Sequence, residues 1–457
     1  MIGGGPLGAD ALARLAEPAL ALRGRGGGEI EGVEVVMRRA AHGVARFANS
    51  QLIQHVDTET MDVSIRVVAA GGRIGVVGVT GAAPDEVAAA AADALAVARL
   101  APEDPEFPGL APAAPVGSVP ADPRTLAASP ADRAAAVAAL LAEVPSDVDA
   151  AGAYEAGGME LGVFTSAGQA ATSLLSHAAL TTVLSGRSSS GYAEEGGRSV
   201  ADIDPAALGG RARDKVLAGV DPVEVDPGTW PVVLEPPAVG ALVQFLAYLG
   251  FSGRAQQEGR AFTSQRLGEA ALDPAVTILD DALDAGTVGF PFDAEGTPKQ
   301  RVELVRDGVL HAVVHDRATG ARAGTGSTGH GLPAPNSWGP MAVNPLLQPG
   351  DGGTVDDLVA GCERGLLVTR FHYTNVIEPI ETVLTGMTRD GTFLVEDGRV
   401  TRAVRNLRFT QSVLGALAAV DALGTETGYA TELFFSGSRS PALRLPAFTF
   451  TSTTTFG

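Results

Sequence analysis

The feature that most constrains this chain is a proline-rich stretch in its first third. Eight prolines fall within residues 101–130. Each proline fixes φ and lacks a backbone N–H, so this stretch can form neither a continuous helix nor a central strand. A second break, AGVDPVEVDPGTWP at 218–231, contains three more prolines. We therefore predict domains at 1–100, 131–222 and 229–457, with 101–130 as an ordered or semi-rigid connector rich in Pro and Ala.

The first two of these regions share one order of elements. Each begins with a helix, continues through four strand-like segments and ends with a second helix, the helices being expected at 9–22 and 84–99, then at 131–143 and 205–218. Period-two alternation is clearest in MDVSIRVV at 61–68. We expect an α+β fold in which two α-β4-α-like repeats form the N-terminal half and a β-rich C-terminal domain follows them.

The C-terminal region is dominated by strand patterns. Two Asp-Gly pairs, at 307–308 and 397–398, lie between alternating segments and predict tight hairpins. The segment VGALVQFLAYLG predicts a helix over 238–250 that is apolar on every side. A second helix is expected at 411–423, where it would cover one face of the sheet.

Composition excludes several classes of function. The net charge of −20, with lysine only at 215 and 299, argues against direct nucleic-acid binding. A single cysteine, Cys362, excludes an intramolecular disulfide framework and every C-x-x-C motif, and it is expected to be a small buried side chain in a reducing cytoplasm. Apolar runs are too short for a membrane span, and the N-terminus lacks a basic start followed by an apolar block. We expect a soluble, cytoplasmic protein with no membrane contact.

Histidine motifs offer little support for a local metal site. None of the seven histidines is followed by glutamate, so the HExxH zinc motif is absent. His311 and His315 are four residues apart, but on a strand this spacing separates their side chains by roughly 13 Å. They are therefore interpreted as polar strand positions and not as two ligands of one metal.

Other generic motifs are equally weak. The glycine-rich run GTGSTGHG at 324–331 lacks the Gly-Lys pair of a phosphate-binding loop, which favours a flexible or strand-binding loop. Neither a G-x-S-x-G elbow nor an S-x-x-K motif is present. The acidic pairs Asp280–Asp281 and Asp293–Glu295 have the residue types of an acid and a base, but the Gly and Pro around them favour turns.

Several longer segments resemble one known family. They are FTSQRLGE at 262–269, TVGFPFDAEGTPKQRVELVRDGVLHAVVHDRATGARAG at 287–324, STGHG at 327–331, GLLVTRFHYTNVIEP at 365–379 and LTGMTRDGTFLVEDGRVTRAVRNLRF at 384–409. Together these segments resemble the TldD/PmbA (TldE) family, formerly called modulators of DNA gyrase. The resemblance extends weakly into the first region through RFANSQLIQ and IRVVAAGGRIGVV.

The resemblance implies a cytoplasmic peptidase system in which a TldD subunit holds zinc and a TldE/PmbA subunit pairs with it. Zinc-binding members have an HExxxH motif on the helix before a G-x-x-G turn. Matching that turn to Gly250–Gly253 places Gln244 at the first histidine, Phe245 at the glutamate and Leu249 at the second histidine. These three side chains provide neither the ligands nor the base that zinc hydrolysis needs, so the resemblance predicts a metal-free member and no cofactor of its own.

The sequence therefore predicts a metal-free, TldE/PmbA-like subunit of a metallopeptidase complex that acts on unfolded or precursor peptides. Its expected partner is a TldD-like, zinc-containing subunit, or a second copy of the chain when that subunit is missing. Two alternatives stay open: a self-assembling peptide-binding protein without a protease partner, and a peptidase with an unrelated, non-metal site.

Candidate peptide-binding residues come from the glycine-rich loop. The loop from Gly324 to Asn336 contains small residues that leave backbone groups approachable by an extended peptide, which can add to it as a strand. The candidates are Gly326, Ser327, Thr328, Gly329 and His330.

Overall fold

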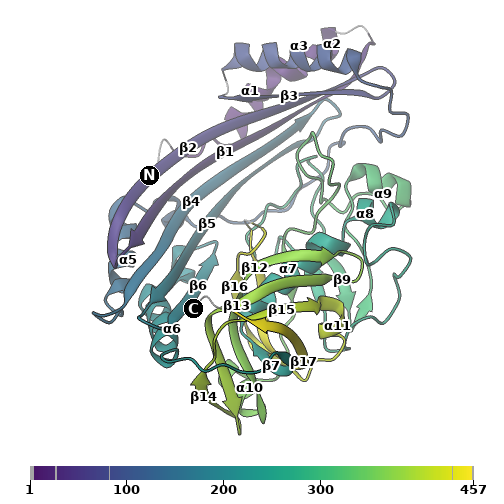
Figure 1. Ribbon diagram of the computed structural model, residues 1–457. Helices are drawn as coiled ribbons and strands as arrows, with labels where there is room; N and C mark the ends of the chain where they lie inside the picture. The colour runs from purple at the N-terminus through teal and green to yellow at the C-terminus, as the bar shows by residue number, and fades with distance from the viewer. Residues whose placement is uncertain (1–4, 26–27, 82, 435, 455–457) are drawn as a thin grey trace.

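A long, curved antiparallel sheet arches over a strand-rich C-terminal domain (Figure 1). The computed structural model describes residues 5–25, 28–81, 83–434 and 436–454. The mixed α+β class and the β-rich C-terminal domain are confirmed. No helix within the described residues is both long enough and apolar enough to cross a membrane.

The N-terminal half forms one six-stranded sheet in the order β3-β2-β1-β4-β5-β6, and all neighbouring strands are antiparallel. Its elements are α1 (Ala9–Leu20), α2 (Leu22–Arg25), β1 (Ile30–Ala48), β2 (Gln51–Ala69), β3 (Arg73–Thr80) and α3 (Pro84–Leu100), then α4 (Pro123–Leu126), α5 (Pro130–Leu141), β4 (Asp149–Thr165), β5 (Ala170–Ser185), β6 (Ser190–Gly197), a short 3-10 turn (Val200–Asp202) and α6 (Pro205–Ala218). The two repeats thus join edge to edge through β1 and β4.

Each repeat contains three strands rather than the four that the sequence predicted. The segments expected to be separate are continuous, because β1 pairs with β2 from Ile30–Ala69 to Ala48–Gln51 and with β4 on its other side. Ladder hydrogen bonds on both sides hold β1 extended where its own alternation of polar and apolar residues fails. The repeat unit is therefore α-β3-α.

Two glycines confirm that the repeats are structurally equivalent. Gly75 on β3 lies so close to α3 that an added Cβ would be 2.0 Å from Ala94 O, and Gly191 on β6 would meet Ala212 O of α6 at 2.1 Å. In both repeats the third strand approaches its helix at a glycine, facing the backbone of an alanine. Only glycine permits this close approach of helix and strand backbones.

The C-terminal domain closes its strands into a ring. Strand β7 pairs with both β12 and β17, and the pairs β12–β13, β13–β15 and β15–β17 complete the circle. The elements are β7 (Gly228–Leu234), α7 (Pro236–Gly250), α8 (Gly253–Gln257), β8 (Ile278–Asp280), β9 (Val302–Arg306), β10 (Val309–Leu310), α9 (Arg317–Ala323), β11 (Pro345–Leu347), α10 (Val355–Ala360), β12 (Arg364–Glu378), β13 (Val383–Glu396), β14 (Arg399–Ala403), β15 (Leu407–Ser412), α11 (Val413–Leu417), β16 (Ala422–Ala430) and β17 (Ser438–Thr453).

Both predicted Asp-Gly hairpins are present, and one predicted helix is wrong. At the two turns the Asp and Gly residues have positive φ, 49° and 77° at 307–308 and 49° and 70° at 397–398, as this turn type requires. The helix expected at 411–423 is reduced to the five residues of α11. Gln411 and Ser412 instead pair with β13, because strand pairing overrides the local helix propensity of this segment.

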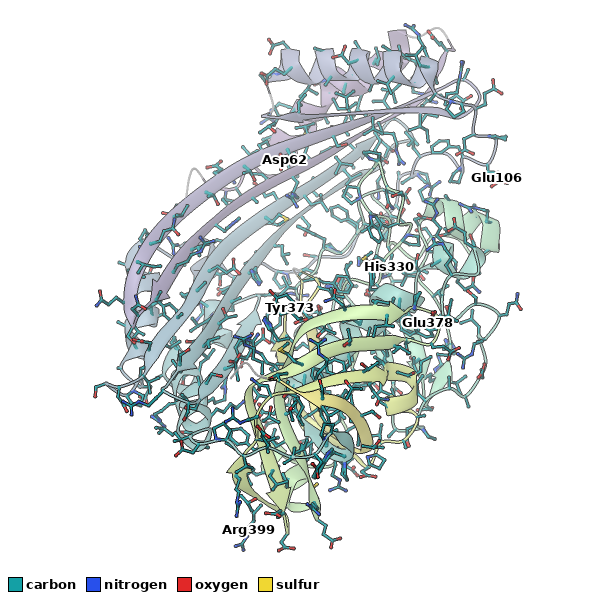
Figure 2. The ribbon with its side chains drawn as sticks, in the orientation of Figure 1. Asp62, Glu106, His330, Tyr373, Glu378 and Arg399 are labelled. Carbon is teal, nitrogen blue, oxygen red and sulfur yellow. The ribbon has the colours of Figure 1, made fainter. Side chains whose placement is uncertain are left out.

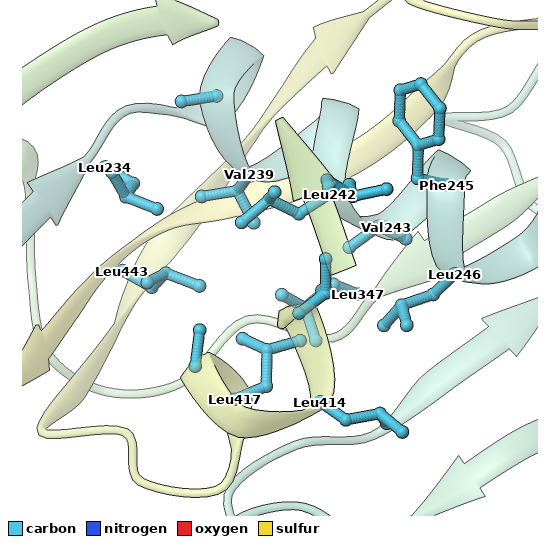
Figure 3. Packing of buried hydrophobic residues seen from close by; sticks show 14 of the residues in the cluster. Leu234, Val239, Leu242, Val243, Phe245, Leu246, Leu347, Leu414, Leu417 and Leu443 are labelled. Atoms are coloured by element: carbon cyan, nitrogen blue, oxygen red, sulfur yellow. The ribbon is translucent and has the colours of Figure 1, made fainter. Parts of the chain in front are cut away.

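The largest core surrounds α7. Its apolar side chains, with those of β7, α11 and β17, form one cluster, part of which Figure 3 shows. Only Tyr248 and the first two residues of this helix are not fully buried. The apolar circumference of the helix is thus covered within its own domain.

Candidate functional site

The family resemblance places zinc-site residues at three positions of helix α7. In this structure the side chains at these positions pack in the core or form hydrogen bonds within the protein. Phe245 and Leu249 lie in the main core, and Gln244 is fully buried. The Gln244 amide donates to Ala430 O and Ser438 Oγ, both at 2.9 Å. Its Oε1 accepts from the backbone N–H groups of 432–434 at 2.8 to 3.3 Å. Gln244 therefore fixes the backbone at residues 430 and 432–434.

The residues around α7 do not fit a zinc ion. Zinc requires nitrogen, sulfur or carboxylate donors, and the only polar side chain among these three positions has all its hydrogen-bonding groups engaged with the protein. Within the described ranges, no three His, Cys, Asp or Glu side chains are grouped so that they could hold a metal.

A cavity of about 440 Å³ lies between the arched sheet and the loops of the C-terminal domain. Leu161 and Leu175 of the sheet contribute to one wall, and Phe290, Phe292 and Leu332 of the loops contribute to the other. This volume is within the usual range of ligand sites, and an apolar wall with few polar groups is typical of them. Figure 2 places His330, which also lines the cavity, in this region between the sheet and the domain.

The polar end of the cavity is built around buried Asp280. Its Oδ1 lies 2.8 Å from His330 Nε2 and 3.8 Å from Lys299 Nζ, and its Oδ2 accepts from Asn344 N at 2.7 Å. Burial opposes the charge of Asp280, but Lys299 and His330 together hold its pKa below the ordinary value. Burial and the charge of Lys299 lower the pKa of His330, so this imidazole is neutral at pH 7. Asp280 ends strand β8, whereas Asp281 begins the turn that the residues around this pair favour.

Thr328, His330 and Asp280 form a hydrogen-bonded chain with the residue types of a hydrolytic triad. Thr328 Oγ1 lies 2.9 Å from His330 Nδ1, and it also accepts from His315 N at 2.7 Å. The His330 side chain has no exposed surface, and Thr328 does not line the cavity. A general base must reach the proton that it removes, so this chain of contacts positions the loop and does not present a nucleophile.

The second acidic pair does lie in a turn, and this turn contacts the sheet. Asp293 accepts from the backbone N–H groups of residues 295, 297 and 331. Glu295 lies 3.8 Å from Arg66 of β2, which also pairs with Glu34 of β1 at 2.6 Å. Burial raises the pKa of Asp293 to about 6. Burial and the neighbouring Asp293 raise the pKa of Glu295 to about 8, because together they outweigh Arg66, which lowers this pKa.

The predicted peptide-binding loop is largely committed to internal hydrogen bonds. Thr328 N donates to His315 O at 3.0 Å, and Thr328 O accepts from Gln300 N at 3.0 Å. Gly329 N donates to Ser327 Oγ at 3.1 Å, and Gly326 N donates to Gly320 O at 3.1 Å. Of the five candidates, His330 alone lines the apolar cavity. The loop thus reaches the cavity through its C-terminal end.

The structure separates the other residues that the sequence singled out. His311 is exposed, whereas His315 is buried with its Nδ1 3.2 Å from Thr319 Oγ1. Cys362 is buried, as expected for a small apolar side chain. Sequence reasoning missed Lys299 and Asn344, because only the fold brings them to Asp280. One available signal was the rarity of lysine, of which the chain has two.

Comparisons with known proteins agree with this fold. Residues 227–452 match the family model described as "PmbA/TldA metallopeptidase C-terminal domain". Among curated relatives, the Metalloprotease TldD homolog of Haemophilus influenzae is 26% identical over 207 residues, which are 45% of this chain and 42% of the relative. A metalloprotease of Methanothermobacter thermautotrophicus is 24% identical over 226 residues, 49% of each chain. The matched part thus spans less than half the length of these relatives.

Solved structures match over almost the whole chain. The putative modulator of a DNA gyrase from Thermotoga maritima has a TM-score of 0.84 at 19% identity, covering 96% of this chain and 100% of its own. TldE from Thermococcus kodakarensis has a TM-score of 0.83 at 19% identity, with 97% and 99% covered. At this identity the likeness establishes the fold. The matched C-terminal domain is of a metallopeptidase-related class. Residues 227–452 belong to the TldD/PmbA family.

Proposed function

We propose that this chain is the metal-free, TldE/PmbA-like subunit of a cytoplasmic metallopeptidase complex, in which a TldD-like subunit holds the zinc and hydrolyses unfolded or precursor peptides. The observation that carries the proposal is the use of Gln244, Phe245 and Leu249 as core and clamp residues. A helix that needs these side chains for packing has no place for a metal and its activated water.

The cavity supports a role in holding peptide. Its apolar wall suits the side chains of an extended, unfolded peptide, whose apolar residues are exposed. At the polar end of the cavity, His330 is neutral and the charges of Asp280 and Lys299 offset each other. This end therefore has little net charge to repel a peptide. In this proposal the cavity holds apolar side chains, while the His330 end of the glycine-rich loop approaches the backbone.

A free strand edge supports association with a partner. Strand β3 pairs with β2 only from Asp62 to Ala69. Within the described part of the chain, residues 51–60 of β2 therefore have no strand on their outer side, and Leu52 and Ile53 there are 42% and 63% exposed. Long unprotected edges are usually covered by another element or chain. We expect a lasting interface of at least ~2,000 Å² with a TldD-like subunit or a second copy.

The decisive experiment measures metal content and turnover together. The purified chain is expected to hold no stoichiometric zinc after dialysis and to cleave no unfolded peptide alone, but to associate with a TldD-like protein in light scattering. About one zinc per chain would overturn the proposal. A monomer at micromolar concentration that ignores the TldD-like protein would instead favour a binding protein without a protease partner.

A cavity variant tests peptide binding by the chain itself. Leu332→Asp places a charge in the apolar wall, and we expect binding of a fluorescent unfolded peptide to weaken about tenfold, because burying a carboxylate is costly. The matched control is Leu267→Asp, at a loop leucine that is 42% exposed and outside the cavity. Equal affinity of both variants, measured by anisotropy, would exclude the cavity as the peptide site.

A further inference from the structure

A second cavity, of about 330 Å³, lies between the central repeat and the C-terminal domain and shares no lining residue with the first. Three irregular segments form its wall. They are the β5–β6 turn at 186–189, the bulge of β13 at Asp390–Gly391 and the 403–406 segment that leads from β14 to β15. Bulges beside cavities commonly redirect side chains toward a ligand.

This cavity is basic in a chain whose net charge is −20. Arg187, Arg389 and Arg405 line it, and Asp390 is the one acidic residue among the described residues that line it. Asp390 Oδ2 already accepts from Arg370 Nε at 2.8 Å, on its other side, so little of its charge is left to offset the three arginines.

The protein provides few hydrogen-bond acceptors for the three guanidinium groups. Arg187 makes no hydrogen bond or ion pair within the described residues. Arg389 Nε lies 3.8 Å from Asp390 Oδ1, and Arg405 Nε lies 3.6 Å from Glu224, an exposed side chain. Arginine forks are the usual recognition groups for carboxylates and phosphates, because they donate two parallel hydrogen bonds.

Neutral donors add to the basic wall. The side chains of Ser189, Ser190 and Asn406 line the cavity without a hydrogen-bond partner in the part of the chain that the structure describes. Thr392, which is 3% exposed, is also among the lining residues. The serine hydroxyls and the asparagine amide can donate hydrogen bonds to an anion that lies beside the arginines.

We propose that this cavity binds a small anion with at least two phosphate or carboxylate groups. A single phosphate or carboxylate group cannot form bidentate hydrogen bonds with three arginines at once. The cavity volume is also several times that of a single phosphate. Among the described residues that line the cavity none is aromatic, and these residues offer no stacking platform for a nucleotide base. This inference is independent of the proposed role in a peptidase complex.

The test is calorimetric titration of the full chain with pyrophosphate, citrate and inorganic phosphate. We expect pyrophosphate or citrate to bind at one site and much more tightly than inorganic phosphate, and the preferred one identifies the anion class. Arg187→Gln should weaken that binding about tenfold, because it removes charge-assisted hydrogen bonds to the anion. The Arg187 side chain lies in an exposed turn and has no hydrogen-bond partner within the described residues, so the fold does not depend on it.

The matched control is Arg402→Gln, which makes the same charge change on β14 next to the lining residue Ala403 but outside the cavity. Its affinity should stay within twofold of the unaltered chain. Arg389→Gln tests the opposite wall of the cavity and should also weaken binding of the preferred anion. Thermal melting checks that this variant is folded. Three results would overturn the proposal: no saturable heat with any of the anions, equal weakening by Arg402→Gln, or equal weak binding of inorganic phosphate and pyrophosphate, which indicates an adventitious ion only.

Discussion

The arched sheet and the C-terminal domain are both built mainly from antiparallel strands, but different forces hold them together. Neighbouring strands of the sheet are mostly neighbours in the chain, and its two small cores contain many alanines. The C-terminal ring is closed by β7 and β17, which lie about 200 residues apart in the sequence, and it encloses a large core of Leu, Val and Phe. The sheet depends on close backbone approach, and the domain depends on packed side chains.

The largest effect is expected from the buried amide of the C-terminal domain. Gln244→Leu keeps the size of the side chain but leaves the N–H groups of residues 432–434 without their acceptor. We expect unfolding free energy to fall by about 3 kcal/mol in urea titrations, the cost of several unsatisfied polar groups. Gln300→Leu, whose amide makes one exposed hydrogen bond, is the control. A loss below about 1 kcal/mol would show that the amide is not a structural clamp.

Paired glycine substitutions test the equivalence of the two repeats. Gly75→Ala and Gly191→Ala each place a methyl group against the backbone of the facing helix. Each should cost about 2 kcal/mol, because neither helix can move away without losing its own packing. Gly78→Ala, on the same strand as Gly75 but with its nearest neighbour 3.9 Å away, should cost little. Unequal losses at 75 and 191 would mean that the repeats share topology without sharing packing.

The smallest effect concerns pH at the contact between the two regions. The pKa of Glu295, near 4.5 when unfolded, is raised to about 8 when folded, so the folded state binds more protons between these values. Its stability therefore falls as pH rises from 5 to 8, and Glu295→Gln should recover about 1 to 2 kcal/mol of that loss. Denaturation midpoints at pH 5 and pH 8 measure the difference. Asp293 and Glu194, with raised pKa values of about 6 and 7, act in the same direction and leave a residual slope. An unchanged slope in the variant would indicate that another group causes it.

The candidate site was predictable only in part. The sequence identified His330 and both acidic pairs, but it gave no reason to join Asp280, Lys299 and Asn344, which are up to 64 residues apart. The sequence favoured a turn around the pair Asp280–Asp281 without showing what Asp280 contacts. Tertiary contacts with His330 and Asn344 instead bury it at the end of a strand.

The sequence by itself determined the features that depend on neighbouring residues. These are the helices α3, α5, α6 and α7 to within two residues, and the hairpin turns that need positive φ at 307–308 and 397–398. The tertiary structure decided the strand count of each repeat, the ring closure by β7 and the fate of residues 411–423. Helix capping and turn conformation are local free energies, whereas strand pairing depends on partners that lie far away in the chain.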